Sequence, residues 1–387
     1  MVRKKSLIVL LTLFCFTISA QKVITKEYES EILETTRNFK IYLPEGYEDE
    51  ENEKKNYPLA IVLNEEYLFN LYVGNSVLFA KRDKAPKQIV VGISMKESFD
   101  EDISFDRNSG KLTYSANNFY AFLRDEVLFY MEGNYRTSPF VTLVGDGYAG
   151  NLITHFLYEK TPFINSYICI SPSFSDYIGQ QLQSYNLERY KEEDNIFYFY
   201  SNNSNSFSAK KQAKIAAVQR GLLSLQVENF NIINDISNTV SSVSAISEAI
   251  PRALTKVFEI YSGISKDEYN RNIKNLSPPD AISYLENKYL EIEFLFGSDL
   301  GIRERDIFAI ENIIIEKENG DYLKDFGTMI LKLFPSSPLG NYYIGRFYED
   351  GKQMKKALLE YKKGYGKMDP GDPNADKFYE NVLRVGG

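Results

Sequence analysis

The fold is decided by the stretch LVGDGYAG, residues 143–150. The apolar run 141–144 is typical of a buried strand, and the run after residue 150 is typical of a helix. Gly145, Gly147 and Ala149 stand at alternate positions of the turn between them. A strand that turns sharply into a helix needs small residues at this spacing, because larger side chains would collide across the turn. The stretch therefore predicts a strand–turn–helix unit with Gly147 at its tip.

Strands and helices alternate on both sides of this unit. Six further short runs are predicted as strands, at residues 39–43, 59–63, 89–94, 166–170, 196–200 and 225–232. Apolar residues at helical spacing lie between them, as in 119–130 and 246–257. This alternation favours an α/β fold with a mainly parallel sheet covered by helices on both faces.

The chain changes character after Tyr261, where helix-like segments are separated by prolines and glycines. We predict an α/β domain at 21–261, a linker at 262–277 and a small all-α domain at 278–387. Part of this last domain has the residue order of a tetratricopeptide repeat, in Ile344, Gly345, Tyr348, Ala357, Tyr361, Gly364 and Pro370. Pro335 and Pro370 are 35 residues apart, against a repeat of about 34. An ordinary helical hairpin remains the alternative to this TPR-like interpretation.

The N-terminus has the pattern of a cleaved secretory signal. A basic segment, Arg3-Lys4-Lys5, precedes the apolar run 7–18, and small residues follow at Ser19-Ala20. We predict cleavage of residues 1–20 near Ala20 and export to the periplasm or the medium. The apolar run is shorter than the roughly 20 residues of a membrane-spanning helix, and no later run reaches that length. The sequence therefore predicts no membrane span.

Charge and motifs exclude several classes of function. The net charge is −8, and loss of the three basic residues of the signal would make it −11. Such a charge argues against nucleic acid as a partner. The sequence has no phosphate-binding loop, no H-E-x-x-H motif and no cysteine–histidine cluster. We therefore expect no cofactor and no metal site.

Five segments together resemble the esterase D and enterochelin-esterase-like family of α/β-hydrolases. Members of this family have a YP strand, a VGI strand, a YRT segment that leads into G-H-S-x-G-G, and a strand that ends in SPS. The corresponding segments are YPLAIVLNEEYLF (57–69), IVVGIS (89–94), YMEGNYRTSPFVTLVGDGYAG (130–150), YICISPSF (167–174) and a closing helix at 245–258. The resemblance covers residues 25–261. It implies an α/β-hydrolase fold in which residues 145–149 form the turn that carries the nucleophile, here called the elbow.

The resemblance also implies that all three catalytic positions are substituted. The nucleophile position falls on Gly147, and the histidine position falls on Val240 in NTVSSV (238–243). The acid is expected in SNNSNSF (201–207), which contains no carboxylate. Placing the nucleophile at Asp146 instead would lose the small residue that must precede it. We therefore name no catalytic residue.

Two other groups of residues bear on the site. The chain has one histidine, His155, which we interpret as a satisfied helix-packing residue. Backbone N–H groups of Tyr148 and of the Asn64-Glu65 turn are expected near the elbow, where they could hold an oxygen atom. By position, we predict the pocket-lining residues to be Glu65, Glu66, Arg107, Asp146 and Tyr148.

Three hypotheses follow for the function. The leading one is an exported, non-catalytic member of the esterase family that binds an unidentified ligand or an envelope protein. The alternative is an active carboxylic-ester hydrolase with an unrecognised nucleophile. In the third hypothesis, the C-terminal helices carry the function and the hydrolase fold only supports them.

Overall fold

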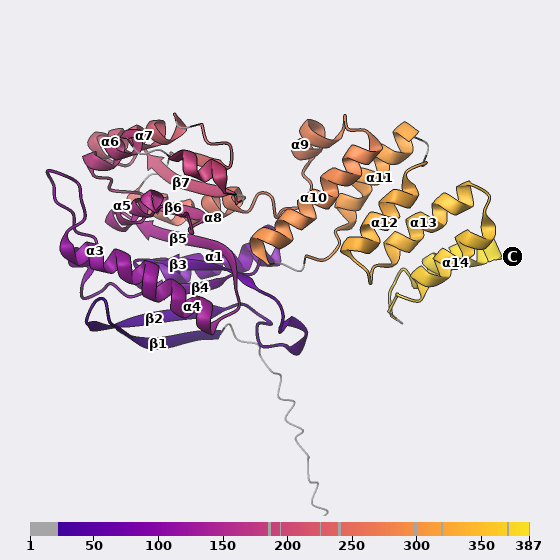
Figure 1. Cartoon of the computed structure of the whole chain (residues 1–387), viewed down its shortest axis with the longest axis horizontal. Helices are drawn as coiled ribbons and strands as arrows, with labels where there is room; N and C mark the ends of the chain where they lie inside the picture. The colour runs from indigo at the N-terminus through magenta and orange to yellow at the C-terminus, as the bar shows by residue number, and fades with distance from the viewer. Residues whose placement is uncertain are drawn as a thin grey trace, which may run out of the picture.

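The N-terminal part of the chain forms one eight-stranded sheet (Figure 1). The computed structural model describes residues 22–184, 187–193, 195–224, 226–238, 241–297, 300–318, 320–369 and 371–386. The strand order is β1-β2-β4-β3-β5-β6-β7-β8, and β3 to β8 run parallel, whereas β2 is antiparallel to β1 and β4. The strands are β1 (Lys22–Ser30), β2 (Thr35–Leu43), β3 (Tyr57–Val62), β4 (Ile89–Ile93), β5 (Thr137–Asp146), β6 (Ser166–Ile170), β7 (Phe197–Ser204) and β8 (Phe230–Ser237). The predicted α/β fold with a mainly parallel sheet is confirmed.

Strand β1 is a strand that the sequence analysis did not predict. It lies at the edge of the sheet, and most of its side chains are exposed. Charged residues such as Lys26 and Glu27 interrupt any apolar run in it. Exposed edge strands commonly carry charges because these discourage pairing with a second chain. The expected apolar pattern of a buried strand is therefore missing there.

Helices cover both faces of the sheet, as predicted. Side chains of each central strand alternate between two cores, so Leu59 and Ile61 of β3 enter one core and Ala60 and Val62 enter the other. The first core is covered by α3 (Tyr114–Ala121), the π-helical turn η2 (Phe122–Val127), α4 (Leu128–Asn134), α5 (Tyr148–Ile153), η3 (Thr154–Tyr158), α6 (Asp176–Ser184) and α7 (Ala209–Leu223). The second is covered by α1 (Glu65–Lys81) and α8 (Ser242–Val257). Short helical turns η1 (Glu50–Asn52), α2 (Phe99–Asp102) and η4 (Leu187–Glu192) lie in the loops.

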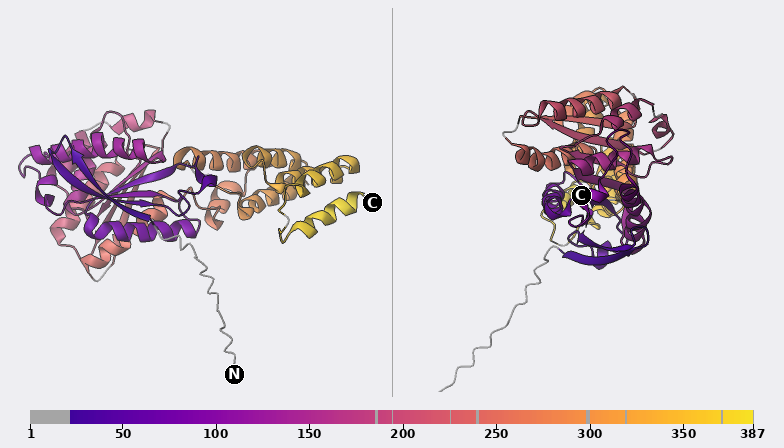
Figure 2. Two further views of the ribbon diagram at one scale, coloured as in Figure 1. Left: turned by 90° about the horizontal axis from the view of Figure 1, so that it is seen from below. Right: turned by 90° about the vertical axis from the view of Figure 1, so that its left-hand side faces the viewer.

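The C-terminal part is helical and extends away from one end of the sheet (Figure 2). Its elements are α9 (Lys266–Glu268), η5 (Tyr269–Ile273), α10 (Pro278–Phe296), α11 (Glu304–Glu318), α12 (Leu323–Leu333), α13 (Pro338–Asp350), α14 (Met354–Tyr365) and α15 (Ala375–Gly386). Residues 262–277, where we expected a linker, contain α9 and η5, and their Ile264 and Ile273 are buried in the core of the helical part. None of the helices within the described residues is long and apolar enough to cross a membrane.

Helix α10 joins the two parts of the chain. Its Leu285 and Tyr289 belong to the helical core, whereas Phe296 at its end belongs to the second core of the sheet. The Phe296 ring lies 5.0 Å from that of Phe140, measured between centroids. Beyond this helix, Arg303 donates two hydrogen bonds of 2.5 and 2.6 Å to the carboxylate of Asp83. The helical part is thus packed directly against the α/β part.

Helices α13 and α14 approach each other closely at Gly345. A Cβ atom at this position would lie 2.5 Å from the Tyr361 ring, which is fully buried. The Tyr361 hydroxyl donates a 2.7 Å hydrogen bond to Glu349 of α13. Glycine is required at residue 345 because the tyrosine ring occupies the space of a side chain.

We predict that Gly345→Ala lowers the stability of the protein by about 1–3 kcal/mol, because the added methyl overlaps the Tyr361 ring. Gly133→Ala in α4 is the matched control, since a Cβ there meets no atom within 4 Å. It should leave stability unchanged or raise it by up to about 1 kcal/mol through helix propensity. Chemical denaturation followed by circular dichroism measures both. Equal destabilisation by the two substitutions would contradict the packing described for α13 and α14.

Candidate functional site

The elbow is a tight turn with glycine at its tip. Strand β5 ends at Asp146, helix α5 begins at Tyr148, and Gly147 between them has φ 59° and ψ −118°. Glycine adopts this conformation far more readily than other residues. A Cβ at Gly145 would lie 2.9 Å from the backbone carbon of Ala149, so the turn needs a glycine there. A Cβ at Gly147 would meet no atom within 4 Å. The backbone of a nucleophile turn is present, and there is room for a side chain at its tip.

The end of strand β6 braces this turn. The Gly147 N–H donates to the Ile170 carbonyl at 3.0 Å, and the Ser173 N–H donates to the Gly147 carbonyl at 2.8 Å. Further along, the Ser175 N–H donates to the buried side chain of Asn151 in α5. The last residue of β6 and the SPS segment (171–173) therefore hold the elbow through one backbone hydrogen bond each.

The region expected to supply the acid contains amides instead. Strand β7 continues to Ser204, beyond the predicted end at residue 200. The Asn202 side chain is fully buried and bonds the Ser171 N–H and the Ala245 carbonyl. Asn205 donates a 2.7 Å hydrogen bond to the side chain of Asn238, which joins the loops after β7 and β8. Val240, the expected histidine position, lies outside the described residues.

His155 is not among the residues that line the elbow cavity. It lies in η3, packs edge-on against Tyr158 at 5.9 Å between ring centroids, and lines a separate pocket with Tyr120 and Gln181. Its Nε2 is buried and has no hydrogen-bond partner among the described residues, so the interpretation of a satisfied histidine was wrong in that respect. Burial lowers the pKa of His155 to about 4. The ring is therefore neutral at physiological pH.

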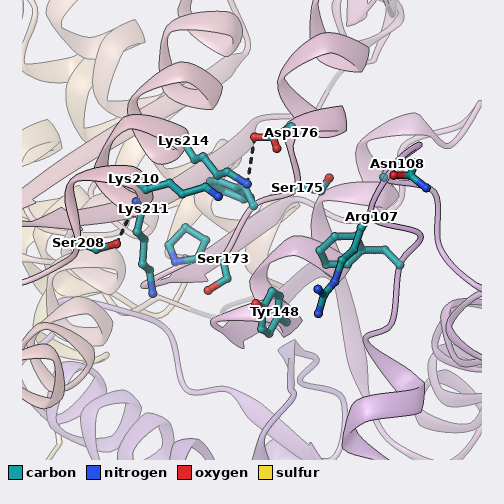
Figure 3. A pocket seen from close by; sticks show the side chains of 14 residues that line it. Arg107, Asn108, Tyr148, Ser173, Ser175, Asp176, Ser208, Lys210, Lys211 and Lys214 are labelled. Carbon is teal, nitrogen blue, oxygen red and sulfur yellow. Dashed lines mark hydrogen bonds and ion pairs between the residues drawn. The ribbon is translucent and has the colours of Figure 1, made fainter.

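A cavity of about 590 Å³ opens beside the elbow, at the carboxyl ends of the strands (Figure 3). Its walls come from the loop before α3, the elbow, the loop after β6 and the start of α7. The lining residues are Phe105, Arg107, Asn108, Gly110, Tyr148, Pro172, Ser173, Phe174, Ser175, Asp176, Ser208, Lys210, Lys211 and Lys214. Ligands of α/β proteins commonly bind at this edge of the sheet, in cavities of this size.

The cavity is cationic although the protein is acidic. Among the described residues, four lining side chains carry a positive charge, namely Arg107, Lys210, Lys211 and Lys214, and one, Asp176, carries a negative charge. The whole chain has a net charge of −8. Asp176 forms a 3.0 Å ion pair with Lys214. The four positive charges of the lining thus exceed its one negative charge by three.

Asp146 of the elbow belongs to a small polar cluster next to the cavity. The Tyr67 hydroxyl donates a 2.9 Å hydrogen bond to its Oδ2, and its Oδ1 is buried without a hydrogen-bond partner among the described residues. Burial raises the pKa of Asp146, while Tyr67 and the nearby Lys211 ammonium act in the opposite direction. Burial also lowers the pKa of Lys211. The Asp146 carboxylate and the Lys211 ammonium therefore interact electrostatically beside the cavity.

The five predicted pocket residues do not all meet in this cavity. Arg107 and Tyr148 line it, and Asp146 lies beside it. Glu65 is buried and forms a 2.7 Å ion pair with Lys40 of β2, and Glu66 is exposed on α1. Neither glutamate is among the lining residues.

The lysines of α7 are the site residues that the sequence analysis missed. They follow Ser208, whose hydroxyl accepts the Lys211 N–H and caps the helix. Cations at a helix N-terminus oppose the helix dipole, which favours negative charge there. The pattern SAKKQAK (208–214) in the segment after a strand was therefore a usable signal, since local rules are broken most often at functional sites.

Comparison with known proteins gives one sequence family and several related folds. Residues 30–216 match the family described as "Putative esterase". This part of the chain belongs to the esterase family. No curated protein sequence matches the chain.

Solved structures share the fold of this esterase-family protein. An uncharacterised protein from Capnocytophaga ochracea has a TM-score of 0.81 at 23% identity, and the match covers 94% of this chain and 99% of the other. An IroE-like serine hydrolase from Shewanella oneidensis has a TM-score of 0.56 at 19% identity, with 81% and 98% covered. The BES protein from Bacillus cereus has a TM-score of 0.52 at 16% identity, with 66% and 98% covered. The first of these matches extends over the C-terminal helices as well as the esterase-family part.

We predict that the single histidine titrates with a midpoint near pH 4, which the one set of imidazole resonances in an NMR titration reports directly. The pKa of His155 in the folded protein lies below the value of 6.5 for a free side chain. Stability is therefore lost as the pH falls from about 6.5 to about 4, by up to about 3 kcal/mol from this residue.

His155→Gln provides the matched control for this titration. Glutamine does not ionise, so unfolding measured between pH 7 and pH 4 should be less pH-dependent in the variant than in the wild type. A resonance midpoint close to 6.5 would show that the imidazole is not desolvated.

Proposed function

We propose that this esterase-family protein does not hydrolyse esters and acts by binding a ligand in the cavity beside the elbow. The observation that carries the proposal is the combination of an intact elbow backbone with glycine at its tip. A serine at this position would attack the substrate, and glycine has no atom that can do so.

The surrounding chemistry supports the loss of activity. A serine nucleophile needs an adjacent base to accept its proton, and His155 lines a different pocket. Backbone N–H groups at the start of α5 have no partner within the helix, so they could hold an oxygen atom of a ligand. Such donors stabilise an oxyanion but supply neither a nucleophile nor a base.

An open cavity favours ligand binding over a purely structural role. The side chain of Tyr148 could have filled the former active site. It is instead 48% exposed and forms one wall, with its ring 5.9 Å from that of Phe105 between centroids. About 590 Å³ remains accessible. This volume is in the range of small-molecule sites, roughly 300–1,000 Å³.

The remaining assignments are part of the same proposal. Residues 1–20 act as a signal peptide, which lies outside the described residues, and the mature protein works in the periplasm or the medium. The α/β domain spans 21–261, and the TPR-like helices of 278–387 offer a surface for an envelope protein. The close approach of α13 and α14 at Gly345 is what a repeat of this kind requires.

An active hydrolase is the second candidate, and one observation favours it. The cavity contains the hydroxyl of Ser173 and the ammonium of Lys211, whose pKa is lowered by burial. A lysine of lowered pKa can act as a base for a serine. No hydrogen bond between these two side chains is present among the described residues. The proposal of a binding protein therefore has better support.

Purified protein assayed with short acyl and feruloyl esters tests the proposal. We predict no turnover above the buffer blank for the wild type. Gly147→Ser should remain inactive because it restores the hydroxyl without a base, and its positive φ should cost about 1–3 kcal/mol of stability. Gly147→Ala is the matched control for this strain.

Turnover of an ester by the wild type would contradict the proposal. Wild-type turnover that persists through purification and is abolished by Ser173→Ala or Lys211→Met would establish the hydrolase. It would also assign the nucleophile or the base.

A further inference from the structure

The cavity beside the elbow has a distribution of charge that the fold itself does not require. Lys210 and Lys211 lie in the first turn of α7, and Lys214 lies one turn further. Positive charge there is unfavourable to the helix dipole. The three ammonium groups also repel each other, because they line one cavity. A bound negative charge would relieve both effects.

We propose that the cavity binds a small organic anion with two negative charges on one head group and a flat apolar body. This inference rests on the proposed function, because it names the ligand class of the same site. The head group lies between the α7 lysines and Arg107, and the apolar body lies against the aromatic wall.

The placement of the cations supports a head group with two charges. Figure 3 shows the lysines on one side of the cavity and Arg107 on the other. Asp176 pairs with Lys214 and neutralises one of the four positive charges. Arg107 and Lys210 form no ion pair among the described residues. Two or more charges are therefore available to a ligand, and charge-assisted hydrogen bonds are about twice as strong as neutral ones.

The aromatic residues define the second half of the ligand. Phe105 and Tyr148 pack together at one side of the cavity, and Pro172 and Phe174 line it from the loop after β6. Flat apolar groups pack well against such rings. A simple inorganic anion would leave this wall exposed to water. The ligand is thus expected to gain affinity from a ring or a similar planar group.

Size and overall charge exclude a large polyanion. The cavity of about 590 Å³ suits a small molecule. The net charge of −8 opposes a nucleic acid outside the cavity. The positive region is therefore a local feature suited to a ligand of the size of an aryl phosphate.

Phenyl phosphate is the probe for this site, with inorganic phosphate and phenol as its two halves. Titration calorimetry at pH 8 and fixed ionic strength presents phosphate mainly as a dianion, since its second pKa is about 6. We expect saturable binding of phenyl phosphate that is at least about tenfold tighter than that of either half. Binding no tighter than that of phenol would overturn the proposal.

A pair of double variants locates the binding. Lys210→Gln/Lys214→Gln should weaken phenyl phosphate binding at least about tenfold, since the loss of Lys210 removes a charge-assisted contact and the loss of Lys214 leaves the Asp176 carboxylate of the lining unpaired. Lys355→Gln/Lys362→Gln on α14 removes the same charge at exposed positions away from the cavity and should change affinity less than twofold. Equal weakening by both pairs of substitutions would show that affinity depends only on the net charge of the protein, and it would overturn the proposed site.

Two further measurements, thermal unfolding and phenol release, separate this inference from the proposed function. Thermal unfolding of the Lys210→Gln/Lys214→Gln variant should show no loss of stability, because the removal of repulsive charges from the helix start offsets the loss of the partly exposed ion pair between Lys214 and Asp176. Release of phenol from phenyl phosphate by the wild type would refute the non-catalytic function even if binding is tight. Absence of binding without any turnover would refute only the ligand class.

Discussion

The positive φ of Gly147, together with the contact of Gly145 with Ala149, is the constraint on which the site depends. This turn brings the start of α5 to the carboxyl edge of the sheet directly after β5. The Gly147 N–H donates to the Ile170 carbonyl and the Ser173 N–H donates to the Gly147 carbonyl, and these two bonds fix the loop after β6 beside the turn. The cavity exists because these two loops and the start of α7 meet at one edge. A hydrolase needs this geometry to present a nucleophile, but the geometry persists here without one.

The side chains at this edge support the proposed loss of activity. The nucleophile position has no side chain, and amides such as Asn202 and Asn205 make structural hydrogen bonds in the region expected to supply the acid. Lysines at the start of α7 and Arg107 opposite them give the cavity a positive charge. A field of this kind attracts and orients an anion but does not by itself cleave an ester bond. Scaffold and electrostatics together favour recognition over catalysis.

The sequence predicted those features that depend on local backbone requirements and apolar runs. The turn at Gly147, strand β6 and the closing helix α8 were visible because small residues and apolar spacing leave a direct signal. Strand β1 was missed because an exposed edge strand needs no apolar run. Of the predicted pocket residues, Arg107 and Tyr148 line the cavity, whereas Glu65 pairs with Lys40. The α7 lysines line the same cavity as Arg107 only because of tertiary folding. Side chains that converge from distant segments cannot be paired from one sequence.

The central claim is that the elbow has kept its backbone and lost its nucleophile. Intact mass measurement after incubation with a fluorophosphonate tests it most directly, because this reagent forms a covalent adduct with an activated serine, and a catalytically active serine esterase serves as the positive control. The account predicts that the mass of this protein stays unchanged under conditions that fully label the control. A stoichiometric adduct at Ser173, or at any other serine of the cavity, would contradict it.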